Sequence, residues 1–324
     1  MSLETKPFLE VNQVKKYFPI KSSLLKKTKA NVQAVENVSI DVFEGETLGI
    51  VGESGCGKST LGRTILGLEE LTGGSIKLRG EEIGGLSEKK LKKYKKEMQM
   101  IFQDPYASLN PRQRIGDALE EAFIIHTELG KKDREQRVRE LLVEVGLKEE
   151  HADRYPHEFS GGQRQRIGIA RAISLNPSLI VCDEAVSALD VSVQAQVIQL
   201  LKKLQDSHQL TYLFISHDLG VVRHMCDRVL VMYLGATAEL ASADELYANP
   251  LHPYTKALLS AIPRPIPGKK KDRVRLEGDL PNPANYPTGC PFHTRCPLAH
   301  DRCREERPEW REVEPDHFVA CHEV

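Results

Sequence analysis

The sequence lacks several features that would place it in common functional classes. No uninterrupted apolar run approaches the roughly 18 residues that a membrane-spanning helix needs. Its charges nearly cancel, with 45 Lys and Arg against 46 Asp and Glu, so the chain as a whole has no general attraction for nucleic acid or an anionic membrane. The amino terminus shows no apolar stretch of the signal-peptide type. We therefore expect a cytosolic protein that does not itself cross a membrane.

Cysteine is sparse over most of the chain and concentrated near its carboxyl end. Three cysteines are scattered through the first 289 residues, and the other four follow closely: Cys290, Cys296, Cys303 and Cys321. Because cytosolic thiols are normally reduced, such a group predicts a metal site before it predicts disulfides. The gaps are wider than the paired C-x₂₋₄-C spacing of most zinc sites, and they do not match bacterial ferredoxins. Zinc, with a nearby histidine as a further ligand, a [4Fe–4S] cluster, and free or disulfide-bonded thiols all remain open.

Short, continuously apolar runs alternate with helical patterns through most of the chain. Buried strands are predicted at residues 47–51, 98–102, 179–182, 212–215 and 228–232, which indicates an α/β fold with a mainly parallel sheet. A mostly helical stretch interrupts this pattern, and prolines accumulate after about residue 240. The predicted organisation is an α/β core at 8–104 and 159–245, a helical subdomain at 105–158 and a small cysteine-rich extension at 246–324.

A phosphate-binding loop follows the first of these buried strands. The segment Gly-Glu-Ser-Gly-Cys-Gly-Lys-Ser at 52–59 fits the pattern G-x-x-x-x-G-K-[ST] and leads into a helix. Glycines let backbone N–H groups point at phosphate oxygens, Lys58 adds a mobile positive charge, and the Ser59 hydroxyl can ligate Mg²⁺. Cys56 is expected to be packed or outward-facing rather than a nucleophile. The predicted ATP-binding residues of this loop are Gly52, Ser54, Gly55, Cys56, Gly57, Lys58, Ser59 and Thr60.

Polar residues end three of the predicted strands. Asp183 would hold the Mg²⁺ shell, and Glu184 is placed to accept a proton from water attacking the γ-phosphate. Gln103 and His217 end two other strands and so lie at the carboxyl edge of the sheet, where ligands of open α/β folds bind. Either one alone could be a surface or capping residue, but in company with the acidic pair both favour a functional site.

A second anion-binding device opens a later helix. Ser160 is a good helix cap, and Gly161 and Gly162 expose backbone N–H groups at the positive end of that helix, ahead of Gln163. Two such devices on one chain suggest a head-to-tail pair, in which each chain's second device closes on the nucleotide of the other chain.

These residues resemble the ATPase subunits of ABC transporters, over residues 8–240. The motifs occur in the family's order: a Walker A loop at 52–60, the Q-loop Gln103, the signature at 160–163, the Walker B strand with Glu184, a D-loop ending in Asp190, and the switch His217. The resemblance implies catalytic roles for Glu184, His217 and Gln103, and Mg²⁺ ligation by Ser59, Gln103 and Asp183. It also implies an aromatic ring stacked on adenine, for which the spacing after Val14 favours Phe18 over Tyr17.

A narrower resemblance involves the proline-rich and cysteine-rich carboxyl end. Asn-Pro-Leu-His-Pro-Tyr-Thr at 249–255, the signature context and the D-loop context look like those of oligopeptide and dipeptide importer ATPases, in particular the second ATPase that such importers carry. The resemblance implies a peripheral subunit at the cytoplasmic face of the membrane, paired with a different ATPase chain and served by two permease subunits and an extracytoplasmic peptide-binding protein. It also implies a [4Fe–4S] cluster on the four cysteines. Ala185 departs from the family, which normally has proline there, but no catalytic group is lost.

Two rival functions remain open at this point. The same motor could serve an importer of nickel or another small cargo, because the cargo contacts lie in other chains. A soluble ABC ATPase acting on ribosomes or DNA is less consistent with the sequence, since the chain has neither two fused cassettes nor a long coiled-coil insert. We therefore expect no nucleic-acid partner.

Overall fold

The computed structural model describes residues 6–21, 28–104, 106, 109–262 and 276–324, and the chain forms two compact units. The first unit comprises Met1–Phe43, Thr47–Leu86 and Ser216–Val324. The second comprises Glu44–Glu46 and Ser87–Ile215. Within the described residues, no helix is long and apolar enough to span a membrane.

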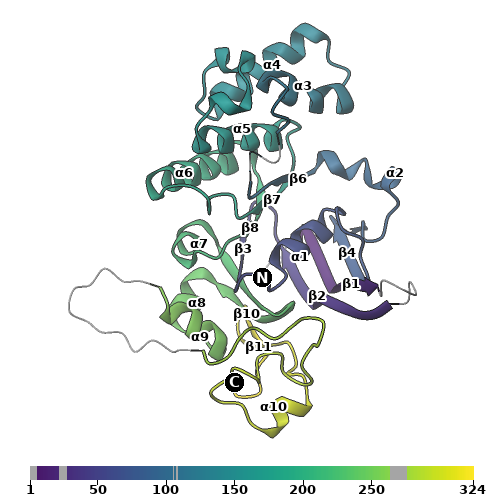
Figure 1. The fold of residues 1–324 in the computed structure, drawn as a ribbon, viewed down its shortest axis with the longest axis vertical. Coiled ribbons are helices and arrows are strands. Elements are labelled where there is room, and N and C mark those ends of the chain that lie inside the picture. Colours follow the sequence, from purple (N-terminus) through teal and green to yellow (C-terminus); the bar gives the residue numbers. More distant parts are fainter. Residues whose placement is uncertain (1–5, 22–27, 105, 107–108, 263–275) are drawn as a thin grey trace, which may run out of the picture. The chain divides into compact units, whose positions relative to one another are not determined.

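The first unit contains an antiparallel sheet with the strand order β2-β1-β4-β5 (Figure 1). Its core face is apolar: Val11 and Val14 of β1 are fully buried, as is Val38 of β2. The long pairing of β1 with β2 runs from Leu9 opposite Val42 to Lys21 opposite Thr28. The strands of this sheet are β1 (Leu9–Lys21), β2 (Thr28–Val42), β4 (Gly73–Leu78) and β5 (Glu81–Glu82).

A second sheet of the first unit joins strands that are far apart in the sequence. β3 and β9 are parallel, and β10, β12 and β11 add to them in antiparallel order. These strands are β3 (Thr47–Val51), β9 (Arg228–Tyr233), β10 (Ala236–Ser242), β11 (Arg311–Glu314) and β12 (His317–Val319). The helices of the unit are α1 (Lys58–Ile65), α7 (Leu219–Met225), α8 (Ala243–Ala248), α9 (Pro253–Ser260) and α10 (Asp301–Glu305).

The cysteine-rich end of the chain shares its apolar core with the rest of this unit. Tyr233 of β9, Tyr254 of α9 and Phe292 are buried, with ring centroids 4.8 to 5.4 Å apart. Such edge-on aromatic contacts add to the free energy gained from burying the rings. Packing therefore continues across residue 246, where the sequence composition changes.

The second unit is built on three parallel strands in the order β8-β7-β6. All residues of β7 and β8 are buried, as continuously apolar runs predict for strands covered on both faces. The strands are β6 (Met98–Ile101), β7 (Leu179–Asp183) and β8 (Thr211–Ile215). The helices are α2 (Glu88–Leu91), α3 (Ile115–His126), α4 (Lys131–Glu144), α5 (Gly161–Ile173) and α6 (Val191–His208).

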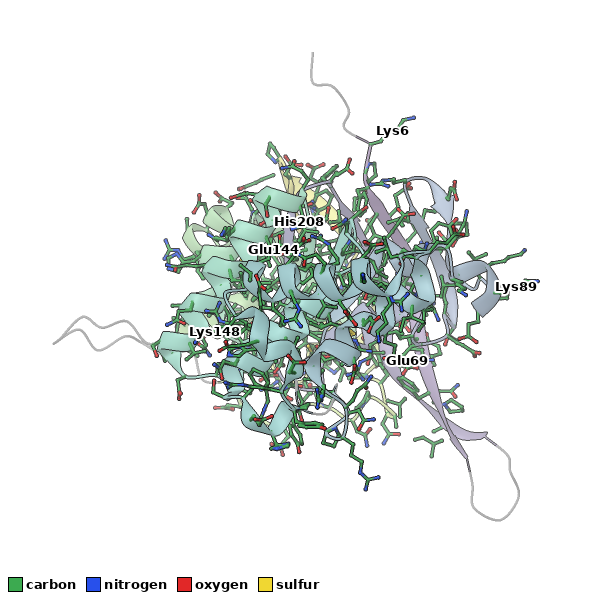
Figure 2. All side chains as sticks on the ribbon, turned by 90° about the horizontal axis from the view of Figure 1, so that it is seen from above. Lys6, Glu69, Lys89, Glu144, Lys148 and His208 are labelled. Atoms are coloured by element: carbon green, nitrogen blue, oxygen red, sulfur yellow. The ribbon has the colours of Figure 1, made fainter. Side chains whose placement is uncertain are left out.

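An ion pair joins the carboxyl ends of two helices in the second unit. His208, the last residue of α6, approaches Glu144, the last residue of α4, with 2.5 Å between Nε2 and Oε1 (Figure 2). Both side chains are partly buried, so the contact is less accessible to solvent than one between two fully exposed side chains. It fixes the end of α4 against α6.

The predicted buried strands are confirmed, whereas β4, β5, β10, β11 and β12 were not predicted. β10 has the buried Glu239 in the middle of its sequence, which breaks the apolar pattern that marks a core strand. β2 also begins earlier than its alternating pattern at residues 35–43 indicates, because its first residues pair with β1, with Val32 opposite Phe18. The strand conformation of this segment comes from its pairing with a neighbouring strand, which the local sequence pattern does not encode.

Candidate nucleotide-binding site

The phosphate-binding loop of the first unit depends on backbone conformations that glycine adopts easily. Gly52, Gly55 and Gly57 have φ angles of +152°, +80° and +99°. A side chain at Gly52 would place its Cβ 2.2 Å from the Met232 carbonyl oxygen. At Gly57 the corresponding distance to the Ala34 carbonyl oxygen is 2.1 Å. The loop is therefore shaped by close backbone packing, and substitution at either position would displace it.

Lys58 is held inside this loop. Its side chain is almost fully buried, and Nζ donates hydrogen bonds to the carbonyl oxygens of Gly52 (2.8 Å) and Glu53 (3.0 Å). Burial raises the pKa of the Cys56 thiol, so this thiol stays protonated and packed rather than reactive. Ser54 and Gly55 are exposed at the tip of the loop, and Ser59 and Thr60 lie in the first turn of α1. This arrangement suits a loop whose backbone N–H groups surround an anion, with the Lys58 ammonium group beside them.

Glu53 connects the loop to the carboxyl-terminal extension. Arg295 donates two hydrogen bonds to its carboxylate, at 2.6 and 3.1 Å, and the Glu53 backbone N–H donates to the Tyr254 hydroxyl oxygen at 2.9 Å. The pair raises the pKa of the Arg295 guanidinium, whose side chain is only 8% exposed. Sequence reasoning missed this contact, because nothing local marks two residues 242 positions apart as partners.

The two candidate adenine-stacking residues differ in their partners. The Tyr17 hydroxyl donates to the Glu36 carboxylate, which also accepts a hydrogen bond from Arg307 at 2.9 Å. Burial and the neighbouring Glu36 raise the pKa of Tyr17 to about 12. Phe18 is partly exposed, with the Lys16 ammonium 4.6 Å from its ring centroid. The hydroxyl of Tyr17 is thus hydrogen-bonded to Glu36 of β2. Phe18 has no hydroxyl and makes no such bond.

His217 lies at the start of the last segment of the first unit. It is exposed, and it follows the final residues of β8 and precedes α7. Asp218 caps that helix by accepting the backbone N–H groups of Gly220 and Val221 at 2.8 and 3.2 Å. The cap fixes the backbone directly after His217.

In the second unit, the strand β7 delivers the two predicted acids to its carboxyl end. Asp183 is 1% exposed. Glu184 has a φ of +49°, an uncommon conformation for a residue with a side chain. Gln103 donates from Nε2 to Glu184 Oε2 at 2.9 Å. The structure therefore brings together Gln103 and Glu184, which the sequence placed at the ends of neighbouring parallel strands.

The signature segment forms the start of α5 as predicted. Ser160 and Gln163 make a reciprocal capping box, with bonds of 3.3 and 3.0 Å. Ser160 and Gly161 are exposed, whereas a Cβ on Gly162 would lie 2.5 Å from Val193. Asp190, the exposed end of the D-loop, immediately precedes α6. A hollow of about 160 Å³ is lined by parts of the Q-loop, α5 and the D-loop, including Gln103, Gly161 and Leu189.

The four late cysteines all lie in the first unit, close enough for the other three sulfurs to act on the pKa of Cys290. Burial raises the pKa of Cys290 to about 11, and the other three sulfurs contribute in the same direction. Across the described residues, no three of these sulfurs lie within 4.8 Å of one another. Four thiols in one part of the fold suit a soft metal group.

Comparison with known proteins identifies the relatives of this chain. The ABC transporter family model matches residues 35–187, and the oligopeptide/dipeptide transporter C-terminal region matches residues 238–303. The oligopeptide transport ATP-binding protein AppF of Bacillus subtilis (strain 168) is 58% identical, over 97% of this chain and 96% of its own. The di/tripeptide transport ATP-binding protein DppF of Pseudomonas aeruginosa (strain UCBPP-PA14) is 53% identical, over 91% of each.

Solved structures of ATP-binding cassettes share the fold. The dimeric post-hydrolysis structure of the cassette MJ0796 bound to ADP and Pi has a TM-score of 0.65 and 28% identity, covering 72% of this chain and 98% of that one. CbiO1 of Clostridium perfringens, part of the transporter complex CbiONQ, has a TM-score of 0.64 and 25% identity, covering 75% of this chain and 91% of its own. The sequence-based resemblance is confirmed: this ATPase belongs to the ABC transporter family, among the oligopeptide/dipeptide transport ATP-binding proteins.

Proposed function

We propose that this chain is one of two different ATPase subunits that power the import of di- and oligopeptides, working at the cytoplasmic face of the cell membrane. The observation that carries the proposal is the 58% identity to an oligopeptide transport ATP-binding protein over nearly the whole chain. The match includes the carboxyl-terminal region typical of that group. Two permease subunits would form the path for the peptide, and an extracytoplasmic binding protein would deliver it.

The phosphates of ATP would bind the loop at residues 52–60. Its positive-φ glycines turn backbone N–H groups toward an anion, and Lys58 provides the cation. Mg²⁺ would be held by Ser59, Gln103 and Asp183, and when bound it neutralises charge on the phosphates. Phe18 is the better candidate for stacking on adenine, because the hydroxyl of Tyr17 is engaged by Glu36.

Hydrolysis would use Glu184 as the group that accepts a proton from the attacking water. The hydrogen bond from Gln103 orients the Glu184 carboxylate. His217, held at a capped helix start, would contact the γ-phosphate. A positioned carboxylate of this kind contributes roughly 10²- to 10⁴-fold to the rate.

The signature segment would act on the nucleotide of the partner ATPase. Ser160 and Gly161 are exposed at the amino end of α5, a helix of 13 residues whose positive end can bind phosphate. Asp190 of the D-loop is also exposed, next to Val191, which is 82% exposed. A head-to-tail dimer would cover these groups. The resemblance to the second of two ATPases favours a heterodimer.

The helical part of the second unit would receive the permease subunits. Ile124 and Ile125, at the end of α3, are 58% and 53% exposed, and Leu129 follows them at 39%. Neighbouring exposed apolar side chains of this size are characteristic of interaction sites. We assign residues 105–158 as the helical subdomain that passes movement from the Gln103 loop to the permeases.

The extension at residues 246–324 would hold a [4Fe–4S] cluster on Cys290, Cys296, Cys303 and Cys321. Support comes from the resemblance to importer ATPases and from the shared place of the four thiols in the first unit, where burial and neighbouring sulfurs raise the pKa of Cys290, Cys296 and Cys321. The role is structural: the cluster would tie together a segment whose other regular elements are short.

The test is ATP hydrolysis by the reassembled importer in lipid vesicles, with the partner ATPase, both permeases and the binding protein. Di- or oligopeptide supplied with the binding protein should stimulate hydrolysis and accumulate across the membrane. The same vesicles carrying the Glu184→Gln chain should do neither. Stimulation by nickel ions instead of peptide, or salt-dependent binding of nucleic acid by the pure chain, would contradict peptide import.

A further inference from the structure

A buried carboxylate and a buried imidazole meet where the carboxyl-terminal strands join the sheet of the first unit. Glu239 of β10 is 0% exposed and His317 of β12 is 1% exposed, with 2.8 Å between Oε1 and Nε2. The same carboxylate accepts the backbone N–H groups of Leu251 and His252, at 2.7 and 2.9 Å. Glu239 therefore accepts three hydrogen bonds from two segments, residues 251–252 and β12.

These contacts fix the orientation and the tautomer of the His317 ring. Because both oxygens of Glu239 already accept N–H donors, the proton of a neutral imidazole belongs on Nε2, facing Glu239. Nδ1 then carries a lone pair. It is buried, and among the described residues it has no hydrogen-bond partner. A buried polar atom in this position is costly unless something else satisfies it.

Two further carboxylates lie near the ring, and that of Glu314 faces its Nδ1. Glu314, at the end of β11, places Oε2 3.9 Å from Nδ1, which is too long for a hydrogen bond. Glu245 of α8 completes a group of three in which one ligand atom from each residue lies within 4.8 Å of the others. A cation between the lone pair and the two carboxylate oxygens would be attracted by all three groups.

We propose that Glu245, Glu314 and His317 bind a divalent cation of the zinc type. One imidazole nitrogen and two carboxylate oxygens form a donor set that Zn²⁺ accepts, with water in the fourth position. Glu239 is the positioning residue: a metal-bound imidazole characteristically donates its other N–H to a carboxylate, and Nε2 of His317 does so here. The site contains no cysteine and is distinct from the four thiols.

The cation would connect the extension to the cassette. Glu245 lies on α8, directly after β10, whereas Glu314 and His317 lie on β11 and β12. Binding would draw the exposed Glu314 side chain onto the buried ring and couple the last strands of the chain to α8. Any cation that binds only the folded arrangement stabilises it by mass action.

Cobalt(II) added to the full-length protein, purified without oxygen so that its thiols keep their own metal, tests the proposal. Cobalt on nitrogen and oxygen ligands gives visible d–d absorption without the near-ultraviolet charge-transfer band of cobalt thiolates. We expect saturable uptake of about one cobalt per chain with d–d bands alone, displaced by zinc. Glu314→Gln and Glu245→Gln should each weaken binding about tenfold or more. Asp244→Asn, on the exposed neighbour of Glu245, is the matched control and should bind as the wild type does.

The alternative occupant of the site is a proton. A doubly protonated His317 would satisfy Glu239 and Glu314 without any metal, and the wild-type protein would then take up no cobalt outside the thiols. That result overturns the proposal, as does unchanged cobalt affinity in both glutamine variants. Because Glu314 is exposed, Glu314→Gln should fold normally, and unaltered ATP affinity would verify this. His317→Gln should abolish the d–d bands.

Discussion

Arg295 clamps Glu53 with two parallel hydrogen bonds, and so fastens the cysteine-rich extension to the phosphate-binding loop. Arg295 directly precedes Cys296, and Glu53 lies between the loop glycines 52 and 55. The geometry is that of a bidentate arginine–carboxylate pair, which is specific in direction as well as favourable in energy. A structural change at Cys296 can therefore alter the nucleotide loop through Arg295 alone.

Arg295→Lys should weaken ATP binding without abolishing it. Lysine keeps the charge but cannot make the two-pronged contact, so the Glu53 carboxylate loses at least one hydrogen bond. We expect a loss of about 1–2 kcal/mol in stability and an ATP Kd raised several-fold, measured by chemical denaturation and by titration of a fluorescent ATP analogue. Arg304→Lys, at an exposed arginine of the same extension, should change neither value. Equal effects of the two variants would show that the clamp does not support the loop.

Glu184→Gln should separate nucleotide binding from hydrolysis. The amide keeps the size of the side chain and can still hydrogen-bond Gln103, but it cannot accept the proton of water. Turnover should fall by roughly 10²-fold or more while ATP affinity is kept, and ATP should trap a dimer visible by size-exclusion chromatography with the partner ATPase. Glu121→Gln, at an exposed position of α3, should hydrolyse normally. Undiminished turnover in Glu184→Gln would refute the assigned role.

Substitutions at residues 17 and 18 distinguish the two aromatic candidates. Phe18→Ala should raise the Kd for ATP by about 5- to 150-fold, which is the range that corresponds to losing one base-stacking contact of roughly 1–3 kcal/mol. Tyr17→Phe keeps the ring and removes only the hydroxyl that binds Glu36, so it should lower stability and leave ATP affinity nearly unchanged. The reverse pattern of affinities would move the adenine contact to Tyr17.

His252 should contribute to the acid sensitivity of the first unit. Burial lowers its pKa from 6.5 to about 3, while its Nδ1 accepts the Tyr254 backbone N–H at 3.0 Å. The unfolded chain therefore binds this proton more readily than the folded chain does. Its contribution is complete above pH 6.5 and decreases as the pH falls toward 3, by about 1.4 kcal/mol per pH unit.

Asparagine at position 252 can still cap α9 but does not titrate. His252→Asn should therefore flatten the fall in unfolding free energy between pH 6.5 and 3, measured by urea denaturation. His224→Asn, at an exposed histidine of α7, should leave the slope as in the wild type. If the two variants keep the same steep slope, His252 is not a source of acid instability.

Protein purified without oxygen should contain about four iron and about four acid-labile sulfide per chain, as a [4Fe–4S] cluster requires. Cys296→Ser removes one thiolate and should reduce both values and the stability of the extension. Zinc in place of iron, measured in protein never exposed to affinity-column metal, would rule out the cluster and leave the ATPase assignment intact.

Local sequence predicted the parts of the site that depend on local chemistry. The loop glycines, the Ser160 cap and the acids that end β7 are each recognisable within a few residues, because phosphate and Mg²⁺ impose both residue type and spacing. The sequence also placed Gln103 at the same edge of the sheet as the acidic pair, and the structure adds that their strands, β6 and β7, are neighbours.

Contacts that depend on long-range packing could not be predicted. Arg295 and Glu53 carry ordinary surface-type side chains, and only the folded extension brings them together. β10 was missed because Glu239 contradicts the apolar pattern of a core strand, although its burial is explained by three hydrogen-bond donors from elsewhere in the chain. In both cases the local structure is determined by a hydrogen-bonding partner that is distant in the sequence.

The pairing of β12 with β10, Glu239 opposite Val319 and Leu240 opposite Phe318, also determines how the sheet ends. Without the extension, β10 would present a row of unpaired backbone groups to other molecules, which is a template for aggregation. In the complete sheet the edge strand is β11 rather than β10. It is four residues long and carries Arg311, Glu312 and Glu314. Short, charged margins of this kind resist strand addition. A chain truncated before β11 should therefore form aggregates at concentrations at which the full chain remains dispersed.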